Sequence, residues 1–266
     1  MFEQHFGLTF NPFDKDIEVD KLFLSHDLKE LSSRLKYMLD SRGICLLTGE
    51  PGSGKTTALR KFATTLNSAL YKPCYLPLTT LTINDFYQAV VSMLGETPAH
   101  KKIALFRQIQ DCIQALYYEQ RITPVFIIDE VHMASIGILD DLRMLFSFKM
   151  DSANPFLMIL SGQPQIRNKL VLNTCYPLKQ RIRMKYSMQG LTEDETVDYC
   201  RTRMKIAGSR TDIFSPVALS AIHAASGGFL RNINNIASAC LIYCASKRTD
   251  VVDEEVVYQA NAELTL

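Results

Sequence analysis

The chain has 266 residues, of which 47% are hydrophobic and 21% charged, and its formal net charge at pH 7 is +1. This length allows one large domain and a smaller one, and the hydrophobic fraction predicts a packed core and excludes general disorder. A net charge near zero gives no overall electrostatic field that would demand nucleic acid or an acidic membrane as a partner.

Short apolar runs alternate with longer stretches of helical periodicity through the first 190 residues. We predict strands at residues 44–50, 74–78, 124–130 and 156–162, with a further edge strand at 184–188. Between them, residues 82–94, 102–120 and 138–148 have apolar positions three and four apart, as helices do. Continuous apolar strands separated by helices are typical of a parallel sheet with helices on both faces, which is an α/β fold.

After Gly190 the pattern changes to helices only. Thr192 followed by Glu195 predicts a capping box that opens a helix running to about Ala207. Further helices are predicted from Ser215 to Gly227–Gly228, over 232–245 and from about 253. We therefore expect an α/β domain at residues 1–190 and a small helical lid domain at 191–266.

The cysteines and the N-terminus indicate where the protein is found. The seven cysteines form no C-x-x-C pair and lie mostly within apolar runs, which is typical of reduced, buried thiols. The first residues lack the pattern of a signal peptide, and no run of 18 apolar residues predicts a membrane-spanning helix. We expect a cytoplasmic protein without a membrane segment.

The segment GEPGSGKT, residues 49–56, matches the pattern G-x-x-x-x-G-K-[ST] between a predicted strand and a predicted helix. Its glycines let consecutive N–H groups turn into a nest that binds phosphate at a helix N-terminus. Lys55 would reach the β- and γ-phosphates of ATP, and the Thr56 hydroxyl would bind Mg²⁺. The predicted nucleotide-binding residues are Gly49, Glu50, Pro51, Gly52, Ser53, Gly54, Lys55 and Thr56, with Thr57 supporting the helix.

Two adjacent acids end the predicted strand PVFIIDE, residues 124–130. Asp129 would hold Mg²⁺, and the Glu130 carboxylate would polarise a water for attack on the γ-phosphate. This acid pair favours an ATP hydrolase over a small-molecule kinase. His132 comes two residues later, and one loop histidine is more often structural than catalytic.

The next predicted strand ends in LMILSGQP, residues 157–164, where Ser161 or Gln163 would emerge between the two strands already described. Either side chain could hydrogen-bond the γ-phosphate or the attacking water, the role called sensor 1, and the sequence leaves the choice open. In this order the motifs resemble the AAA+ superfamily of ATPases.

That resemblance implies two functional arginines. The segment YPLKQRIRMKY, residues 176–186, lies where the superfamily carries its arginine finger, which implies that role for Arg181, or secondly for Arg183. GGFLRNINN, residues 227–235, resembles sensor 2 and implies that Arg231 faces the nucleotide. ATP is then expected between the two domains and at a subunit boundary, with the segment from Phe10 to Leu24 beside the adenine.

Four segments look like the ExeA-type ATPases: FGLTFNPF (6–13), residues 28–57, ILSGQPQIRNKL (159–170) and SGGFLRNINNIASACL (226–241). That group is similar to the MuB and TnsC transposition ATPases, which bind double-stranded DNA as ATP-dependent oligomers and guide a transposase. Pro51 stands where these ATPases often have valine, but it removes no required group. The secretion members carry a membrane segment and a peptidoglycan-binding module that this sequence lacks, which favours the DNA-binding group.

The main expectation is therefore an ATP-hydrolysing, DNA-binding protein that assembles into a ring or helical filament and regulates transposition. The expected DNA contacts are Thr80, in the loop TTLT (79–82), and Lys101 and Lys102, in AHKK (99–102). The alternative is a secretion-type ATPase that acts on a membrane or cell-wall partner. A P-loop kinase of a small metabolite is the third hypothesis, disfavoured by Glu130 and by the helical lid.

Overall fold

The computed structural model describes residues 2–78, 80–150 and 152–264. The chain divides into two compact units. The sheet unit contains residues 30–49 and 55–188. The helical unit contains the residues up to 29, the loop 50–54 and the residues from 189 onward.

The sheet unit is built on five parallel strands, as the sequence predicts. They are β1 (Gly43–Gly49), β2 (Tyr71–Pro77), β3 (Thr123–Asp129), β4 (Leu157–Gly162) and β5 (Ile182–Met188). Their order across the sheet is β2-β3-β4-β1-β5, so β4 lies between β1 and β3, where the sequence places it. The three central strands are almost wholly buried, whereas the edge strands β2 and β5 alternate between buried and more exposed positions.

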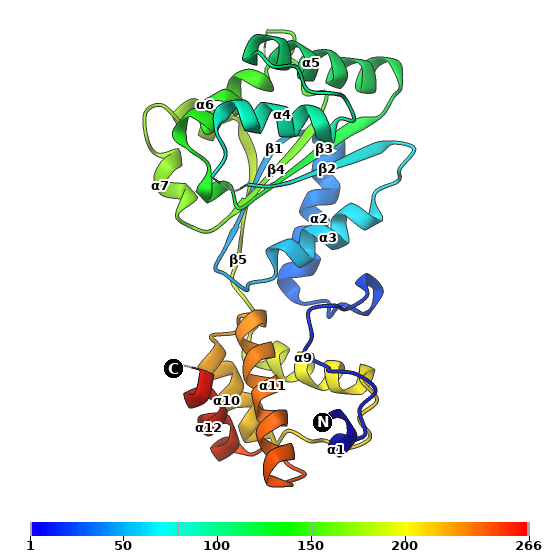
Figure 1. The fold of residues 1–266 in the computed structure, drawn as a ribbon, viewed down its shortest axis with the longest axis vertical. Helices are drawn as coiled ribbons and strands as arrows, with labels where there is room; N and C mark the ends of the chain where they lie inside the picture. The colour runs from blue at the N-terminus through cyan, green and yellow to red at the C-terminus, as the bar shows by residue number, and fades with distance from the viewer. Residues whose placement is uncertain (1, 79, 151, 265–266) are drawn as a thin grey trace. The chain divides into compact units, whose positions relative to one another are not determined.

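Helices cover both faces of this sheet. The helices are α2 (His26–Ser41, of which residues 30–41 belong to this unit), α3 (Lys55–Thr65), α4 (Ile83–Met93), α5 (Lys102–Gln114), α6 (Ile136–Leu145), α7 (Ile166–Leu170) and α8 (Tyr176–Arg181). Figure 1 shows α4, α5 and α6 on one face and α2 and α3 on the other. The predicted helix at 102–120 is not uniform, because α5 ends at Gln114 and continues as a π-helical turn, η2 (Ala115–Glu119).

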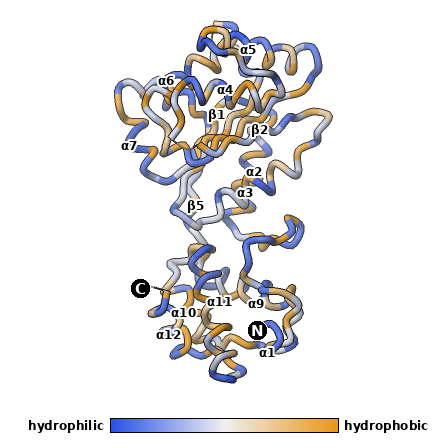
Figure 2. The backbone as a smooth tube through the Cα atoms, in the orientation of Figure 1, coloured by the Kyte–Doolittle hydropathy of each residue, from blue (hydrophilic) through white to orange (hydrophobic). Residues whose placement is uncertain are grey.

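The core of the sheet unit contains a cluster of packed aromatic rings among its aliphatic side chains. The Phe146 ring packs against Phe126 on β3, with ring centroids 5.0 Å apart, and against Phe156 before β4, at 4.9 Å. All three side chains are at most 1% exposed. Figure 2 shows the hydrophobic residues concentrated along the strands, and burial of these side chains provides the main stabilisation of the sheet.

The helical unit contains the helices predicted after Gly190. These are α9 (Glu193–Ile206), α10 (Pro216–Ser226), α11 (Leu230–Lys247) and α12 (Glu254–Leu264). The Thr192 hydroxyl accepts from the Glu195 N–H, and the Glu195 carboxylate accepts from the Thr192 N–H, so the predicted capping box is present. Gly227 ends α10 with φ of 61°, a left-handed conformation that glycine adopts without strain.

The N-terminal segment packs with these helices, which differs from the predicted domain of residues 1–190. It forms α1 (Phe2–Phe6) and a short 3₁₀ turn, η1 (Val19–Lys21). Phe2, Leu8 and Phe13 are buried in the same apolar cluster as α9, α10, α11 and α12. The buried Arg203 guanidinium donates to the carbonyl oxygens of Pro12 and Asp14. The local sequence does not show that the N-terminal segment belongs to the helical unit, because its apolar partners lie about 200 residues further along the chain.

Among the residues that the structure describes, no helix has both the length and the apolar character needed to cross a membrane.

Candidate functional site

The phosphate loop joins β1, which ends at Gly49, to α3, which begins at Lys55. Gly52 and Gly54 have φ of 83° and 94°, a region that residues with a Cβ rarely adopt, so the loop's path requires glycine there. The Lys55 side chain is 6% exposed, and its ammonium donates to the Gly49 carbonyl oxygen at 2.8 Å. The lysine ammonium is therefore held at the start of the phosphate loop, and it is predicted to bind the phosphates of ATP.

The start of α11 lies against this loop, within the helical unit. The Arg231 N–H donates to the Gly52 carbonyl oxygen at 3.3 Å. A Cβ added to Gly52 would lie 2.7 Å from the Arg231 Cβ, so only glycine allows this approach. The backbone of Arg231 is thus next to the phosphate loop, where a residue that senses nucleotide is expected, and its sensor 2 role remains a prediction.

Asp129, at the end of β3, is a buried carboxylate with polar partners from three segments. Its side chain is 2% exposed, and its Oδ2 accepts from the Thr56 hydroxyl at 2.9 Å and from the Tyr75 hydroxyl at 3.4 Å. Its Oδ1 accepts from the Glu130 N–H at 3.0 Å. The structure therefore brings together the two residues, Thr56 and Asp129, that the sequence predicts as ligands of Mg²⁺.

Hydroxyl and carboxylate oxygens are the hard ligands that Mg²⁺ prefers, so the donor set fits this ion.

Sequence reasoning did not identify Tyr75, which lies on the edge strand β2. Burial raises the pKa of its hydroxyl, and the negative charge of Asp129 raises this pKa further. Tyr75 comes near Asp129 only because β2 pairs with β3 in the folded sheet, and a single sequence does not show this pairing.

Glu130 has a strained backbone, with φ of 55° and ψ of 35°. For a residue with a side chain this left-handed conformation costs on the order of 1–3 kcal/mol and is typical of functional sites. The Glu130 Oε2 atom is buried and, among the described residues, receives no hydrogen bond. It lies 3.3 Å from the Nδ1 atom of His132, in the 3₁₀ turn η3 (Val131–Met133).

The end of β4 carries the two candidates for sensor 1. Ser161 is fully buried, and its hydroxyl has no partner among the residues that the structure describes. The Gln163 N–H donates to His132 Nδ1 at 3.3 Å. Ser161 lies near the end of β4 and Gln163 comes directly after this strand, and β4 lies between β1 and β3, so the strand order agrees with either assignment and the choice between them stays open.

Buried polar atoms without partners gather on the predicted motifs. Within the described parts of the chain, such atoms occur in Ser53, Glu130, Asp141 and Ser161. Three of these residues belong to the phosphate loop, the acid pair and the end of β4, whereas the Asp141 carboxylate has an ion pair with Lys102 at 2.6 Å. Buried polar groups are normally satisfied, so each of these three atoms is unusual within its own unit, and a ligand-binding role for them stays a prediction.

The two candidate finger arginines make contacts within the chain. Arg181, at the end of α8, donates to the carbonyl oxygens of Arg143 and Phe146 at the end of α6. Burial lowers the pKa of its guanidinium, and the nearby charge of Arg143 lowers it further. Arg183 donates to the Ser41 carbonyl oxygen at 2.8 Å. A role for either side chain toward a neighbouring subunit stays a prediction.

The predicted DNA contacts differ in their surroundings. Thr80 and Lys101 are exposed, and Thr79 of the same loop lies outside the described residues. Lys102 forms the 2.6 Å ion pair with Asp141 and lies over the Tyr87 ring, 5.3 Å from its centroid. These contacts join α5 to α4 and α6, so Lys102 has a structural partner already.

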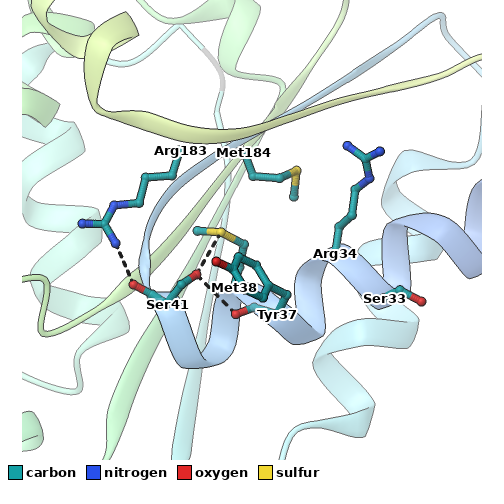
Figure 3. Close-up of a pocket in the computed structure, with 7 residues that line it drawn as sticks. All are labelled: Ser33, Arg34, Tyr37, Met38, Ser41, Arg183 and Met184. Carbon is teal, nitrogen blue, oxygen red and sulfur yellow. Dashed lines mark hydrogen bonds between the residues drawn. The ribbon is translucent and has the colours of Figure 1, made fainter.

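A surface pocket of about 480 Å³ lies between α2 and β5 (Figure 3). It is lined by Ser33, Arg34, Tyr37, Met38, Ser41, Arg183 and Met184. It contains no phosphate-loop residue and neither of the two acids, so it is separate from the predicted nucleotide chemistry.

The fold and this site define a P-loop ATPase. Residues 38–170, half of the chain, match the AAA domain family, so the chain belongs to the AAA family of ATP-hydrolysing enzymes. The α/β fold with an all-parallel sheet that the sequence predicts is thereby confirmed.

More particularly, the chain is similar to general secretion pathway protein A of Aeromonas hydrophila. The two are 32% identical over 246 residues, which cover 91% of this chain and 44% of that protein. The chain thus spans less than half the length of this relative. The similarity supports the ExeA-type resemblance and favours the secretion-type alternative over the transposition hypothesis.

Solved structures share the fold at low identity. Cdc6p from Pyrobaculum aerophilum superposes with a TM-score of 0.72 at 19% identity, covering 95% of this chain and 70% of that one. The Drosophila ORC structure, which is bound to DNA, superposes with a TM-score of 0.70 at 14% identity, covering all of this chain and 66% of that one.

Proposed function

We propose that this chain is the ATP-hydrolysing module of a protein like general secretion pathway protein A, and that ATP turnover changes its interaction with a membrane or cell-wall partner. The observation that supports this proposal most is the cluster of Thr56, Asp129 and Glu130. The aligned residues, which cover 91% of this chain, are 32% identical to that relative. The seven free cysteines and the use of ATP agree with the predicted cytoplasmic location of this module.

In this proposal the chain binds ATP through the phosphate loop. The N–H groups of the loop contact the phosphates, and the Lys55 ammonium exchanges its bond with the Gly49 carbonyl for one with phosphate oxygens. Thr56 and Asp129 would hold Mg²⁺, which neutralises phosphate charge when bound.

Glu130 acts as the general base. Its carboxylate, whose buried Oε2 atom receives no hydrogen bond from the described residues, accepts a proton from the attacking water. Ser161 or Gln163 hydrogen-bonds the γ-phosphate or that water, and Arg231 has the sensor 2 role that the sequence resemblance implies. Arg181 would stabilise charge in a neighbouring subunit's site if the protein assembles into a ring or filament.

Two variants test this function with distinct expected results. Lys55→Ala should lose ATP binding, measured with a fluorescent ATP analogue, because the phosphate charge loses its buried ammonium. Glu130→Gln should bind ATP normally and hydrolyse it about 100-fold more slowly or worse, since the base is removed. A wild-type chain that binds no ATP, or a Glu130→Gln variant with wild-type turnover, would refute the proposal.

A second candidate function is ATP-dependent assembly on double-stranded DNA. It is favoured by the fold shared with the DNA-bound Drosophila ORC structure and by the exposed Thr80 and Lys101. Regulation of transposition, with a transposase as partner, has only the sequence resemblance to support it. Negative-stain imaging with a non-hydrolysable ATP analogue, with and without DNA, tests this candidate. DNA-dependent rings or filaments would favour it over the secretion-type function.

A further inference from the structure

His132 connects the acid pair to the end of β4. It lies in η3, two residues after Glu130, and its side chain is 8% exposed. Its Nδ1 atom has two polar neighbours: the Gln163 N–H, which donates to it at 3.3 Å, and the Glu130 Oε2 atom, also at 3.3 Å. The Gln163 N–H thus forms a hydrogen bond with this ring nitrogen, whereas the Glu130 Oε2 atom lies within ion-pair distance of it and receives no hydrogen bond from the described residues.

A neutral imidazole cannot serve both neighbours at once. When Nε2 carries the proton, Nδ1 accepts from the Gln163 N–H, and the Glu130 carboxylate receives nothing from the ring. When Nδ1 carries the proton, a small rotation of either side chain would let it donate to the Glu130 Oε2 atom 3.3 Å away, and the Gln163 N–H loses its acceptor. The two arrangements differ by one proton position on the ring, exchanged through solvent, with no change in net charge.

The backbone around the imidazole is held by other contacts. Lys169 donates to the carbonyl oxygens of His132 and Ala134, at 2.6 and 2.8 Å. A Cβ added to Gly162 would lie 3.1 Å from both the His132 backbone nitrogen and the Val131 Cγ1, so the end of β4 and η3 are in close contact. Because both segments are fixed, the hydrogen bond of the ring is the part of this connection that can change.

We propose that His132 is a positioning residue for ATP hydrolysis, which holds the Glu130 carboxylate in one arrangement and the backbone of Gln163 in the other. The inference rests on the proposed ATPase function. A ligand bound at Ser161 or Gln163 would change which arrangement is stable, so the end of β4 controls whether Glu130 is oriented toward water. His132 does not itself touch the reacting atoms.

Three substitutions of His132 separate positioning from packing. His132→Asn keeps an amide close to the place of Nδ1, His132→Gln moves the amide toward the place of Nε2, and His132→Ala removes both. In steady-state hydrolysis, His132→Ala and His132→Gln should lower kcat about 10- to 100-fold, the usual effect of misplacing a catalytic group, with KM for ATP changed less than about 2-fold. His132→Asn should retain kcat within about 5-fold of wild type.

A spectroscopic measurement tests the contact without turnover. Long-range ¹H–¹⁵N spectra of the chain without nucleotide report which ring nitrogen of His132 carries the proton, and Glu130→Gln should shift its Nδ1 resonance. The proposal is overturned if Glu130→Gln leaves that resonance unchanged, if His132→Ala keeps kcat within about 2-fold of wild type, or if His132→Asn falls as far as His132→Ala. A wild-type chain that hydrolyses no ATP would instead refute the proposed function, whatever the spectra show.

Discussion

Replacing Gly228 with alanine should strongly destabilise the helical unit. Gly228 lies between α10 and α11 with φ of 77°, and an added Cβ would lie 2.2 Å from the Leu191 carbonyl oxygen. The obstructing atom belongs to the backbone and cannot rotate away. The Leu191 N–H also donates to the Gly228 carbonyl oxygen at 2.8 Å, so a shift of either segment breaks this hydrogen bond.

Two contributions give the magnitude. The left-handed conformation costs an alanine about 1–2 kcal/mol, and loss of the hydrogen bond adds about 0.5–1.5 kcal/mol. With the clash only partly relieved, we expect the free energy of unfolding to fall by about 2–4 kcal/mol, in the upper range for single substitutions.

Gly7→Ala is the matched control, because Gly7 belongs to the same unit, has φ of 65° and would place its Cβ with no atom within 4 Å. It should show the conformational cost alone, about 1–2 kcal/mol. The chain has no tryptophan, so urea unfolding is followed by far-UV circular dichroism. If Gly228→Ala is no less stable than Gly7→Ala, the close approach of Leu191 does not constrain the unit and the reasoning is refuted.

Three other changes have defined outcomes. Arg203→Met removes the donor to two carbonyl oxygens, so we expect a loss of about 1–3 kcal/mol and faster proteolysis of the N-terminal segment; an unchanged cleavage rate would contradict this. Burial raises the pKa of the Cys45 and Cys200 thiols from 9.0 to about 12. The folded chain therefore holds these thiol protons more tightly than the unfolded chain does. The contribution of these thiols to the free energy of unfolding is fully present below pH 9.0 and should be lost between pH 9.0 and about 12. A urea midpoint that stays constant over this range would refute the prediction. Gly162→Ala should displace η3 by a few tenths of an ångström and lower kcat about 10-fold without changing the ATP affinity; equal loss of both would indicate general misfolding.

Elements whose causes are local could be predicted from the amino-acid pattern. Strand and helix positions follow from apolar periodicity, and the capping box at Thr192 follows from two residues three apart. The phosphate loop was also readable, because its glycines, lysine and threonine act through the backbone of one short segment. These features depend on neighbours within a few residues, which a single sequence contains.

The tertiary structure alone decided the features that join distant segments. It placed the Tyr75 hydroxyl near Asp129, gave Lys102 an ion pair with Asp141, and packed the N-terminal segment against α9. It also gave His132 its two neighbours, although the sequence favoured a structural role for this residue. A side chain's partners depend on which strands and helices become neighbours, and that choice comes from burial of the whole core, so no local pattern records it.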